Sequence, residues 1–434
     1  MQTEFSTRQK KLLQTLDNDS IAIIPAGQKL LRNGDSHYPF RQDSNFYYLT
    51  GFPEADSLAV FVPNHDEGEY ILFCQEKNPS KEIWDGKIIG VEAACEIYGA
   101  DKAYAYSSLE TKLPQLMQNR KKLYYDFSIH LNFDKRILAW LENLRTLVRR
   151  GISPPNEIVS LRQILHEWRL YKSAGEQQRM QEAADISAQA HINAMQICKP
   201  GMYEYQLEAE LIRTFLNHGA MSPAYPPIVG SGKNACILHY ISNQAELHDG
   251  DCVLIDSGAE KNFYGADLTR SFPVNGKFST EQKAIYEIVL TAQKAAIAKA
   301  HHQTNWSEMQ NAIIPIITQG LIDLGLIKMS LADAIAQKAY FDFYMHGNGH
   351  WLGLDTHDAG EYKIDGQWRN LANDMVLTVE PGIYISPSNE KVAPRWRGIG
   401  IRIEDDIVIR DKNPIILTKD APKEIDEIEA IMAG

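Results

Sequence analysis

The sequence has few cysteines, and no two of them are spaced as in a metal-binding or redox motif. The five are spread along the chain: Cys74, Cys95, Cys198, Cys236 and Cys252. An odd number of widely spaced cysteines without a C-x-x-C pair argues against a disulfide framework and against a cysteine-based zinc site. We therefore expect reduced thiols and a cytoplasmic location.

Long hydrophobic runs and an excess of basic residues are also missing. No segment approaches the roughly 18 consecutive apolar residues that a membrane helix needs, and the first residues lack the apolar stretch of a signal peptide. With 56 acidic and 44 basic side chains, the formal net charge is −12. This charge argues against nucleic acid or an anionic membrane surface as a partner.

A chain of 434 residues is long for one hydrophobic core, so two domains are expected. Residues 1–170 alternate helical and strand-like patterns, with short apolar runs at 21–24, 57–62, 70–73 and 122–125. Gly151 and the prolines that follow it interrupt this pattern. We expect an α/β domain over residues 1–170 and a second domain over residues 171–434.

The second domain shows a faint internal duplication. A capping box, Ser173-x-x-Glu176, precedes one long helical pattern, and Ser279-x-x-Gln282 precedes another. Each pattern leads into a second helical stretch that ends at a glycine, and strand-like segments follow. This order predicts an α+β domain with pseudo-two-fold symmetry.

Four carboxylates and one histidine of the second domain lie in settings that would hold their side chains still: Asp256, Asp267, His350, Glu380 and Glu404. Three of the acids close apolar, strand-like segments. Asp267 is expected on the strand that returns from Asp256, and His350 lies in a glycine-rich run. Such a ligand set suits a pair of divalent ions of the Mn, Co or Zn type.

Strand periodicity leaves two interpretations of these segments open. In a strand, Ile401 and Ile403 share one face while Arg402 and Glu404 share the other. This pattern is typical of a half-exposed strand as well as of a strand that points an acid into a metal site. The histidines are open to a second interpretation too, as buried structural residues: His239, His346, His350 and His357.

A metal site of this composition would be hydrolytic. The expected nucleophile is a water or hydroxide activated by two divalent ions. A neighbouring carboxylate would take the proton and pass it to the leaving nitrogen. Imidazoles beside the site would stabilise the oxyanion that develops.

Several motifs together resemble those of the pita-bread metallopeptidases. They are Ile228–Gly232 with His239-Tyr240, Ile255–Gly258 with Asp267-x-Thr269-Arg270, His346-Gly347-x-x-His350 through His357-Asp358, Thr378-Val379-Glu380-Pro381-Gly382-x-Tyr384 and Gly398–Asp405. Within that family the chain is most similar to the bacterial Xaa-Pro aminopeptidases, also called aminopeptidase P. The run Gly34–Gln42 resembles the N-terminal domain of those enzymes, which is of the creatinase/prolidase type.

The resemblance implies removal of the N-terminal residue from peptides with proline in second position, by a metalloexopeptidase that usually uses two manganese ions. It implies that Asp267 bridges the ions, that His350 binds one of them, and that Glu380 is both a ligand and the proton shuttle. Contacts to substrate are implied for the remaining residues of the site: His239 and His357 at the transition state, His346, Tyr384 and Arg402 around the proline, Asp256 at the free amine, and Tyr225. Tyr225 precedes Pro226-Pro227, where the family has a more polar stretch.

The resemblance also implies a homo-oligomer, either a dimer or a tetramer, in which the N-terminal domain of a neighbouring subunit reaches the rim of the active site. Four residues are expected at that rim: Asp35, Trp84, Arg150 and Arg369. For Trp84 and Arg150, an ordinary surface or core role remains an alternative.

Other functions are compatible with parts of this pattern. A prolidase shares the fold and the metals but requires a dipeptide. Creatinase shares both domains without metal, and methionine aminopeptidase lacks such a large N-terminal domain. A protein of a different class, a non-catalytic pita-bread binding module, would be expected to have lost metal ligands.

Overall fold

The structure, a computed structural model, describes residues 2–434 and divides into two compact units between Leu165 and His166. The predicted boundary lies five residues later, after residue 170. The division falls inside helix α7 (Arg162–Leu170), so it interrupts no sheet. Each unit is described separately below.

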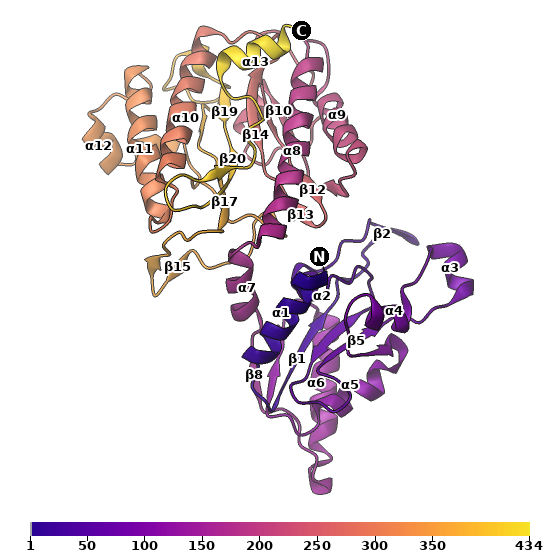
Figure 1. Cartoon of the computed structure of the whole chain (residues 1–434). Helices are drawn as coiled ribbons and strands as arrows, with labels where there is room; N and C mark the ends of the chain where they lie inside the picture. Colours follow the sequence, from indigo (N-terminus) through magenta and orange to yellow (C-terminus); the bar gives the residue numbers. More distant parts are fainter. Residues whose placement is uncertain (1) are drawn as a thin grey trace. The chain divides into compact units, whose positions relative to one another are not determined.

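The first unit contains a six-stranded mixed sheet in the order β6-β5-β4-β1-β7-β8 (Figure 1). The strands are β1 (Ser20–Pro25), β4 (Leu58–Phe61), β5 (Tyr70–Cys74), β6 (Lys102–Ala105), β7 (Lys122–Tyr124) and β8 (Glu157–Val159). The helices are α1 (Gln2–Thr15), α2 (Ser44–Thr50), α3 (Pro79–Asp85), α4 (Gly90–Glu96), α5 (Leu109–Met117) and α6 (Leu131–Arg145). Strands β1, β4 and β5 pair antiparallel, and the outer pairs are parallel. The α/β class predicted for this domain is confirmed.

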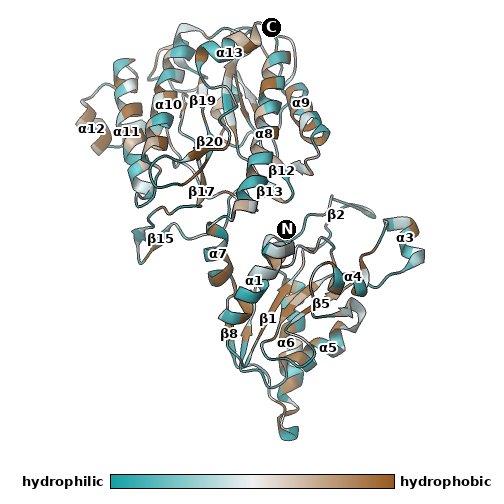
Figure 2. Ribbon diagram, in the orientation of Figure 1, coloured by the Kyte–Doolittle hydropathy of each residue, from teal (hydrophilic) through white to brown (hydrophobic). Residues whose placement is uncertain are grey.

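Apolar side chains explain why these segments form a buried sheet. Every residue of β4 and β5 is buried, and Figure 2 shows the hydrophobic colour running along β1 and β5. Leu113 of α5 and Trp140 of α6 pack in the same apolar cluster as Val60 and Ile71. Helix α3 is different, because none of its residues is buried.

The second unit begins with two helices and three antiparallel strands. Helices α8 (Ala174–Ile197) and α9 (Glu204–Asn217) precede β10 (Ile228–Ser231), β11 (Cys252–Asp256) and β14 (Thr269–Pro273). Short strands β9 (Ser222–Pro223), β12 (Ala259–Lys261) and β13 (Tyr264–Gly265) form a separate small sheet. The capping box predicted at the start of α8 is present, with Ser173 and Glu176 bonded to each other's backbone.

The same order of elements is repeated in the second half of this unit. Helices α10 (Thr280–Lys299), α11 (Trp306–Asp323) and α12 (Leu331–Ala336) precede β17 (Val376–Val379), β18 (Gly382–Tyr384), β19 (Gly400–Arg402), β20 (Asp405–Val408) and β21 (Ile415–Ile416). Strand β17 pairs antiparallel with β20, and β18 pairs antiparallel with β19. Helix α13 (Ile425–Met432) ends the chain. This repeat agrees with the predicted pseudo-two-fold α+β domain.

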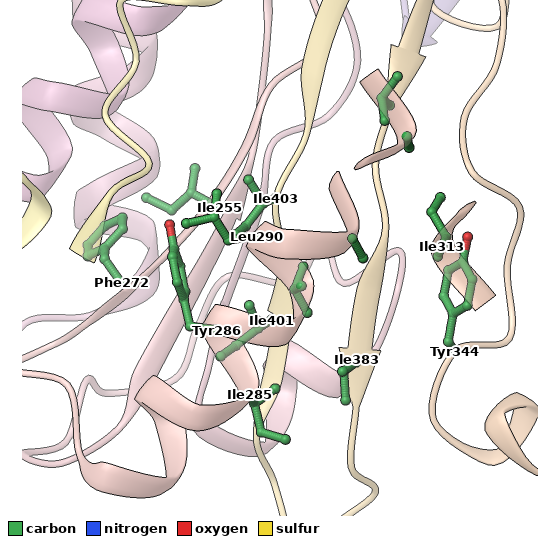
Figure 3. Packing of buried hydrophobic residues seen from close by; sticks show 14 of the residues in the cluster. Ile255, Phe272, Ile285, Tyr286, Leu290, Ile313, Tyr344, Ile383, Ile401 and Ile403 are labelled. Atoms are coloured by element: carbon green, nitrogen blue, oxygen red, sulfur yellow. The ribbon is translucent and has the colours of Figure 1, made fainter. Parts of the chain in front are cut away.

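One large apolar cluster connects the two halves. Figure 3 shows Ile255 of β11 beside Leu290 of α10 and Ile403, which follows β19. Because β11 belongs to the first half and β19 to the second, this cluster fixes the carboxyl ends of strands from both halves. None of the helices in residues 2–434 has the length and apolar character needed to cross a membrane.

Gly258 allows the chain to fold back closely after β11. A Cβ atom at this position would lie 1.7 Å from the carbonyl oxygen of Ala266. No other residue type fits this approach, which brings Asp256 and Asp267 to the same end of the sheet.

We expect Gly258→Ala to force the Ala266 backbone away and to lower the free energy of unfolding by about 1–3 kcal/mol, the usual cost of overpacking. Urea denaturation followed by tryptophan fluorescence measures the difference. The control is Gly347→Ala, because a methyl group there meets no heavy atom within 4 Å and should change stability by less than about 1 kcal/mol. A Gly258→Ala protein as stable as the parent would contradict the close packing described above.

Candidate metal centre

The strand register brings together the carboxylates that the sequence predicted. Asp256 is the last residue of β11 and pairs with Thr269 at the start of β14. Glu380 directly follows β17, whose Val379 pairs with Asp405, the neighbour of Glu404. Two predictions of detail were wrong. Asp267 lies in an irregular stretch before β14 and not within the strand, and Glu404 lies between β19 and β20.

We call five residues the acidic centre: Asp256, Asp267, His350, Glu380 and Glu404. Asp267, His350 and Glu404 each offer a ligand atom, and these atoms lie within 4.8 Å of one another. His350 Nε2 is 3.3 Å from Asp267 Oδ2 and 3.7 Å from Glu380 Oε1. The hydroxyl of Tyr225 lies 2.5 Å from both Asp256 Oδ1 and Asp267 Oδ1. The centre is therefore one continuous cluster.

Asp256, Asp267 and Glu404 are buried and Glu380 is partly buried, so their charge is poorly solvated. Burial raises the pKa of Glu404, and the negative charges of Asp267 and Glu380 raise it further. Burial also raises the pKa of Glu380 to about 7 and raises that of Asp256, although Arg402 opposes both shifts. Several buried carboxylates with raised pKa values fit divalent cations, which would compensate the charge that water does not reach.

The surroundings of His350 orient its ring towards the acids. Its Nδ1 lies 3.0 Å from the backbone oxygen of Trp351, and its backbone N–H donates to Thr378 Oγ1. Nε2 is left facing Asp267 and Glu380, as a metal-binding imidazole requires. Burial lowers the pKa of His350, but the hydrogen bond and charge of Asp267 outweigh it and the pKa rises to about 9.

A second group of side chains extends from the acidic centre along β18 and β19. The Arg402 guanidinium lies 2.5 Å from Asp256 Oδ2 and donates to the Tyr384 hydroxyl at 3.0 Å. That hydroxyl lies 2.9 Å from His346 Nε2. Burial lowers the pKa of His346 to about 4, so its ring is neutral at pH 7. These contacts join three of the residues assigned by resemblance to the proline pocket.

The interpretation of residues 399–404 as a half-exposed strand is wrong. Arg402 is 3% exposed and Glu404 is 2% exposed, while Ile401 and Ile403 on the opposite face are fully buried. Both faces of this segment are covered, so burial of the charged face needs a compensating partner.

The two remaining histidines lie beside the centre on irregular segments. The ring of His357 lies 4.4 Å from that of His350, and burial together with the charge of His350 lowers the pKa of His357. His239 lies in a stretch without helix or strand. It is close enough to contribute to the lowered pKa values of His346 and His357, after the larger effect of burial.

Two residues that support the ligands were not identified from the sequence. The Thr269 hydroxyl donates to Glu404 Oε2 at 2.6 Å and accepts from Arg402. Asp406 Oδ2 accepts from the backbone N–H of Asp267 at 2.9 Å. Each lies two positions after a ligand, but the ligands Asp267 and Glu404 lie outside the strands, so strand alternation does not indicate these contacts.

The four predicted rim residues do not all belong to the unit that contains the acidic centre. Asp35, Trp84 and Arg150 all belong to the first unit, and Trp84 on α3 is 87% exposed. Arg369 belongs to the second unit, where its guanidinium binds both carboxylate oxygens of Glu167 at 2.8 and 2.6 Å.

Comparison with known proteins shows the family of the chain. Residues 178–411 match metallopeptidase family M24, and residues 5–124 match the N-terminal domain of aminopeptidase P. The chain is 42% identical to an Xaa-Pro aminopeptidase of Escherichia coli, over 99% of this chain and 98% of the relative. It is 33% identical to human Xaa-Pro aminopeptidase 3, over 99% of this chain and 86% of the relative.

Solved structures show the same fold over the full length. Aminopeptidase PepP of Pseudomonas aeruginosa superposes with a TM-score of 0.99 at 48% identity, covering 100% of this chain and 98% of that one. A zinc-substituted E. coli aminopeptidase P in complex with product superposes with a TM-score of 0.97 at 42% identity, covering 100% and 98%. The chain therefore belongs to metallopeptidase family M24, in the group that carries the aminopeptidase P N-terminal domain.

Proposed function

We propose that the chain is a metal-dependent Xaa-Pro aminopeptidase that removes the first residue from peptides with proline in second position. The observation that carries the proposal is the acidic centre itself, in which every ligand type expected for this activity is present and buried or partly buried. Full-length similarity to Xaa-Pro aminopeptidases, including the N-terminal domain, favours this function over prolidase.

The residues of the acidic centre fit two divalent ions, and we propose manganese as the metal. Carboxylate oxygens with one imidazole suit hard and borderline cations such as Mn²⁺, with Co²⁺ and Zn²⁺ as alternatives. Asp256, Asp267, His350, Glu380 and Glu404 would hold the pair, with Asp267 shared between the ions. Bound there, such a pair supplies a Lewis acid that lowers the pKa of water and polarises the scissile carbonyl.

The side chains around the ligands have separate tasks in this proposal. Glu380 takes the proton of the attacking water and delivers it to the proline nitrogen, which must be protonated to leave. His239 and His357 donate hydrogen bonds to the carbonyl oxygen as negative charge develops on it. Asp256, held in place by Arg402, accepts from the free substrate amine.

Proline in second position explains why a dedicated site is needed. The Xaa-Pro bond is a tertiary amide without an N–H, and the residue before proline is conformationally restricted. His346, Tyr384 and Arg402 form a hydrogen-bonded group beside the ligands, and Tyr225 lies on the other side of Asp256. We propose that these side chains bound the proline pocket.

We further propose a homo-oligomer, a dimer or a tetramer, in which α3 of one copy packs against another. Helix α3 buries none of its own residues, while Ile83 is 81% exposed and Trp84 is 87% exposed. Large apolar side chains on an unpartnered helix are typical of an interface. In this arrangement Asp35, Trp84, Arg150 and Arg369 would contribute to the rim.

We also propose a cytoplasmic location. The free cysteines support a reducing compartment such as the cytoplasm.

The first prediction concerns substrate. Mass spectrometry after incubation with Mn²⁺ should show release of only the first residue from a tripeptide or longer peptide with proline second. A matched peptide with alanine second should remain intact, and a chelator should stop the reaction. Cleavage confined to an Xaa-Pro dipeptide would instead establish a prolidase. No cleavage of any of these peptides with Mn²⁺, Co²⁺ or Zn²⁺ would favour the non-catalytic binding module.

The second prediction concerns the ligands. Glu380→Gln and His350→Ala should each lower kcat by at least about 100-fold, because the first removes the proposed proton carrier and the second removes a proposed metal ligand. Both proteins should keep the circular dichroism spectrum of the parent. Steady-state assays after chelation and reloading with Mn²⁺ provide the measurement, with Glu427→Gln on the exposed face of α13 as the control. Full activity in either variant would overturn the assignment of the centre.

The third prediction concerns the oligomer. Replacing Ile83 and Trp84 together by alanine should shift the molar mass measured by light scattering towards that of a monomer, and should lower kcat/KM. Leu138→Ala is the control, because Leu138 is another exposed apolar residue on a helix of the same unit. A parent protein that is monomeric at micromolar concentration would contradict the proposed interface.

A further inference from the structure

The position of His239 depends on contacts made by its neighbours. Residues 237–251 form neither helix nor strand apart from an isolated bridge at Glu246. His239 itself is exposed, so packing of its own ring does not fix it. Some buried group must hold this loop if His239 is to meet a substrate carbonyl reproducibly.

Glu204, the first residue of α9, makes the contacts that hold the loop. Its side chain is fully buried. Oε1 accepts from the N–H and hydroxyl of Ser231, both at 2.8 Å, and from Asn234 Nδ2 at 3.1 Å. Oε2 accepts from the hydroxyl of Tyr240 and the N–H of Ala245, both at 2.9 Å. One carboxylate therefore binds the chain on both sides of His239, including the adjacent residue.

The pattern of these contacts requires a side chain that accepts hydrogen bonds at both ends. Both oxygens of Glu204 accept from a backbone N–H, which a carboxylate can do and a carboxamide cannot. Hydrogen bonds to a charged acceptor are roughly twice as strong as neutral ones. A glutamine of the same shape would turn an N–H₂ group towards one set of donors and lose those bonds.

The start of α9 adds two further attachments for the loop. The backbone N–H of Glu204 donates to Ala245 O at 2.9 Å, and that of Leu247 donates to Met202 O at 2.7 Å. One turn along the helix, Glu208 accepts from Asn243 Nδ2 at 2.9 Å. Residues four apart lie on the same helix face, so α9 presents one surface to the loop.

We propose that Glu204 is a positioning residue for the peptidase reaction, which acts by holding the loop that carries His239. The inference rests on the function proposed above, in which His239 donates to the developing oxyanion. Glu204 contacts no ligand of the acidic centre in these bonds, so its loss should leave metal binding intact. A small displacement of a positioned group can reduce the rate by about 100-fold.

The test is a double-mutant cycle of Glu204→Gln with His239→Ala, measured as kcat and KM at saturating Mn²⁺. Glu204→Gln alone should lower kcat about 10- to 100-fold, with unchanged metal content by mass spectrometry. In the His239→Ala background the same substitution should change kcat by less than about threefold, since the group that it positions is absent. An equal loss in both backgrounds would overturn the inference, because a general structural defect acts whether or not His239 is present.

Two further variants separate positioning from folding. Tyr240→Phe removes one donor to Glu204, keeps the ring, and should give a smaller loss that also disappears in the His239→Ala background. If the Glu204→Gln protein does not fold, Tyr240→Phe becomes the test. Equal losses from Tyr240→Phe in both backgrounds would then overturn the inference.

Glu176→Gln is the matched control, a buried carboxylate that accepts from Tyr264 and caps α8. It should lower thermal stability without changing kcat. Full activity of His239→Ala alone would contradict the role of His239 in the proposed function. An equal loss from Glu204→Gln in both backgrounds would contradict only the positioning role of Glu204.

Discussion

Burial of several like charges in one small space is the constraint on which the rest of the second unit depends. Asp256, Asp267 and Glu404 are each at most 9% exposed, and each would repel the others when ionised. Protein groups supply partial compensation: Arg402 on Asp256, the Tyr225 hydroxyl on Asp256 and Asp267, Thr269 on Glu404, and the ring of His350 beside Asp267. The remaining imbalance explains why the pKa values of Asp256 and Glu404 rise and why the cluster fits divalent cations.

The scaffold around the cluster is built to keep the acids in place. Arg270, which is fully buried, donates to the backbone oxygens of Thr269, Glu404, Ala421 and Pro422 and to Asp405 Oδ1. A single guanidinium thus connects β14, the Glu404 segment and the chain before α13. Burial would raise the pKa of Asp405, but Arg270 and Lys423 lower it to about 2. This neighbouring acid is therefore satisfied by protein groups, in contrast to the acidic centre beside it.

The sequence predicted the ends of the strands well because apolar runs that stop at an acid are local signals. Asp256 and Glu380 lie where those runs end. The supporting contacts were not predictable in the same way, since Thr269 meets Glu404 and Asp267 meets Asp406 across more than 130 residues of chain. The residues next to Glu204 in the sequence give no sign of its role, and only the folded loop shows that its carboxylate accepts from donors on both sides of His239. These supporting contacts depend on which distant segments pair in the folded chain, and residue type alone does not predict them.

The most direct test of the acidic centre is metal binding by the chelated protein, measured as stoichiometry by calorimetric titration with Mn²⁺ and by native mass spectrometry. We expect two ions per chain and a higher unfolding temperature once they bind, because ligands that bind only the folded state stabilise it. Asp267→Asn should lose both ions, since Asp267 is the ligand that we propose the two ions share. Failure of the chelated protein to bind divalent ions, or unchanged binding of two ions by Asp267→Asn, would contradict the assignment of the acidic centre as a dinuclear metal site.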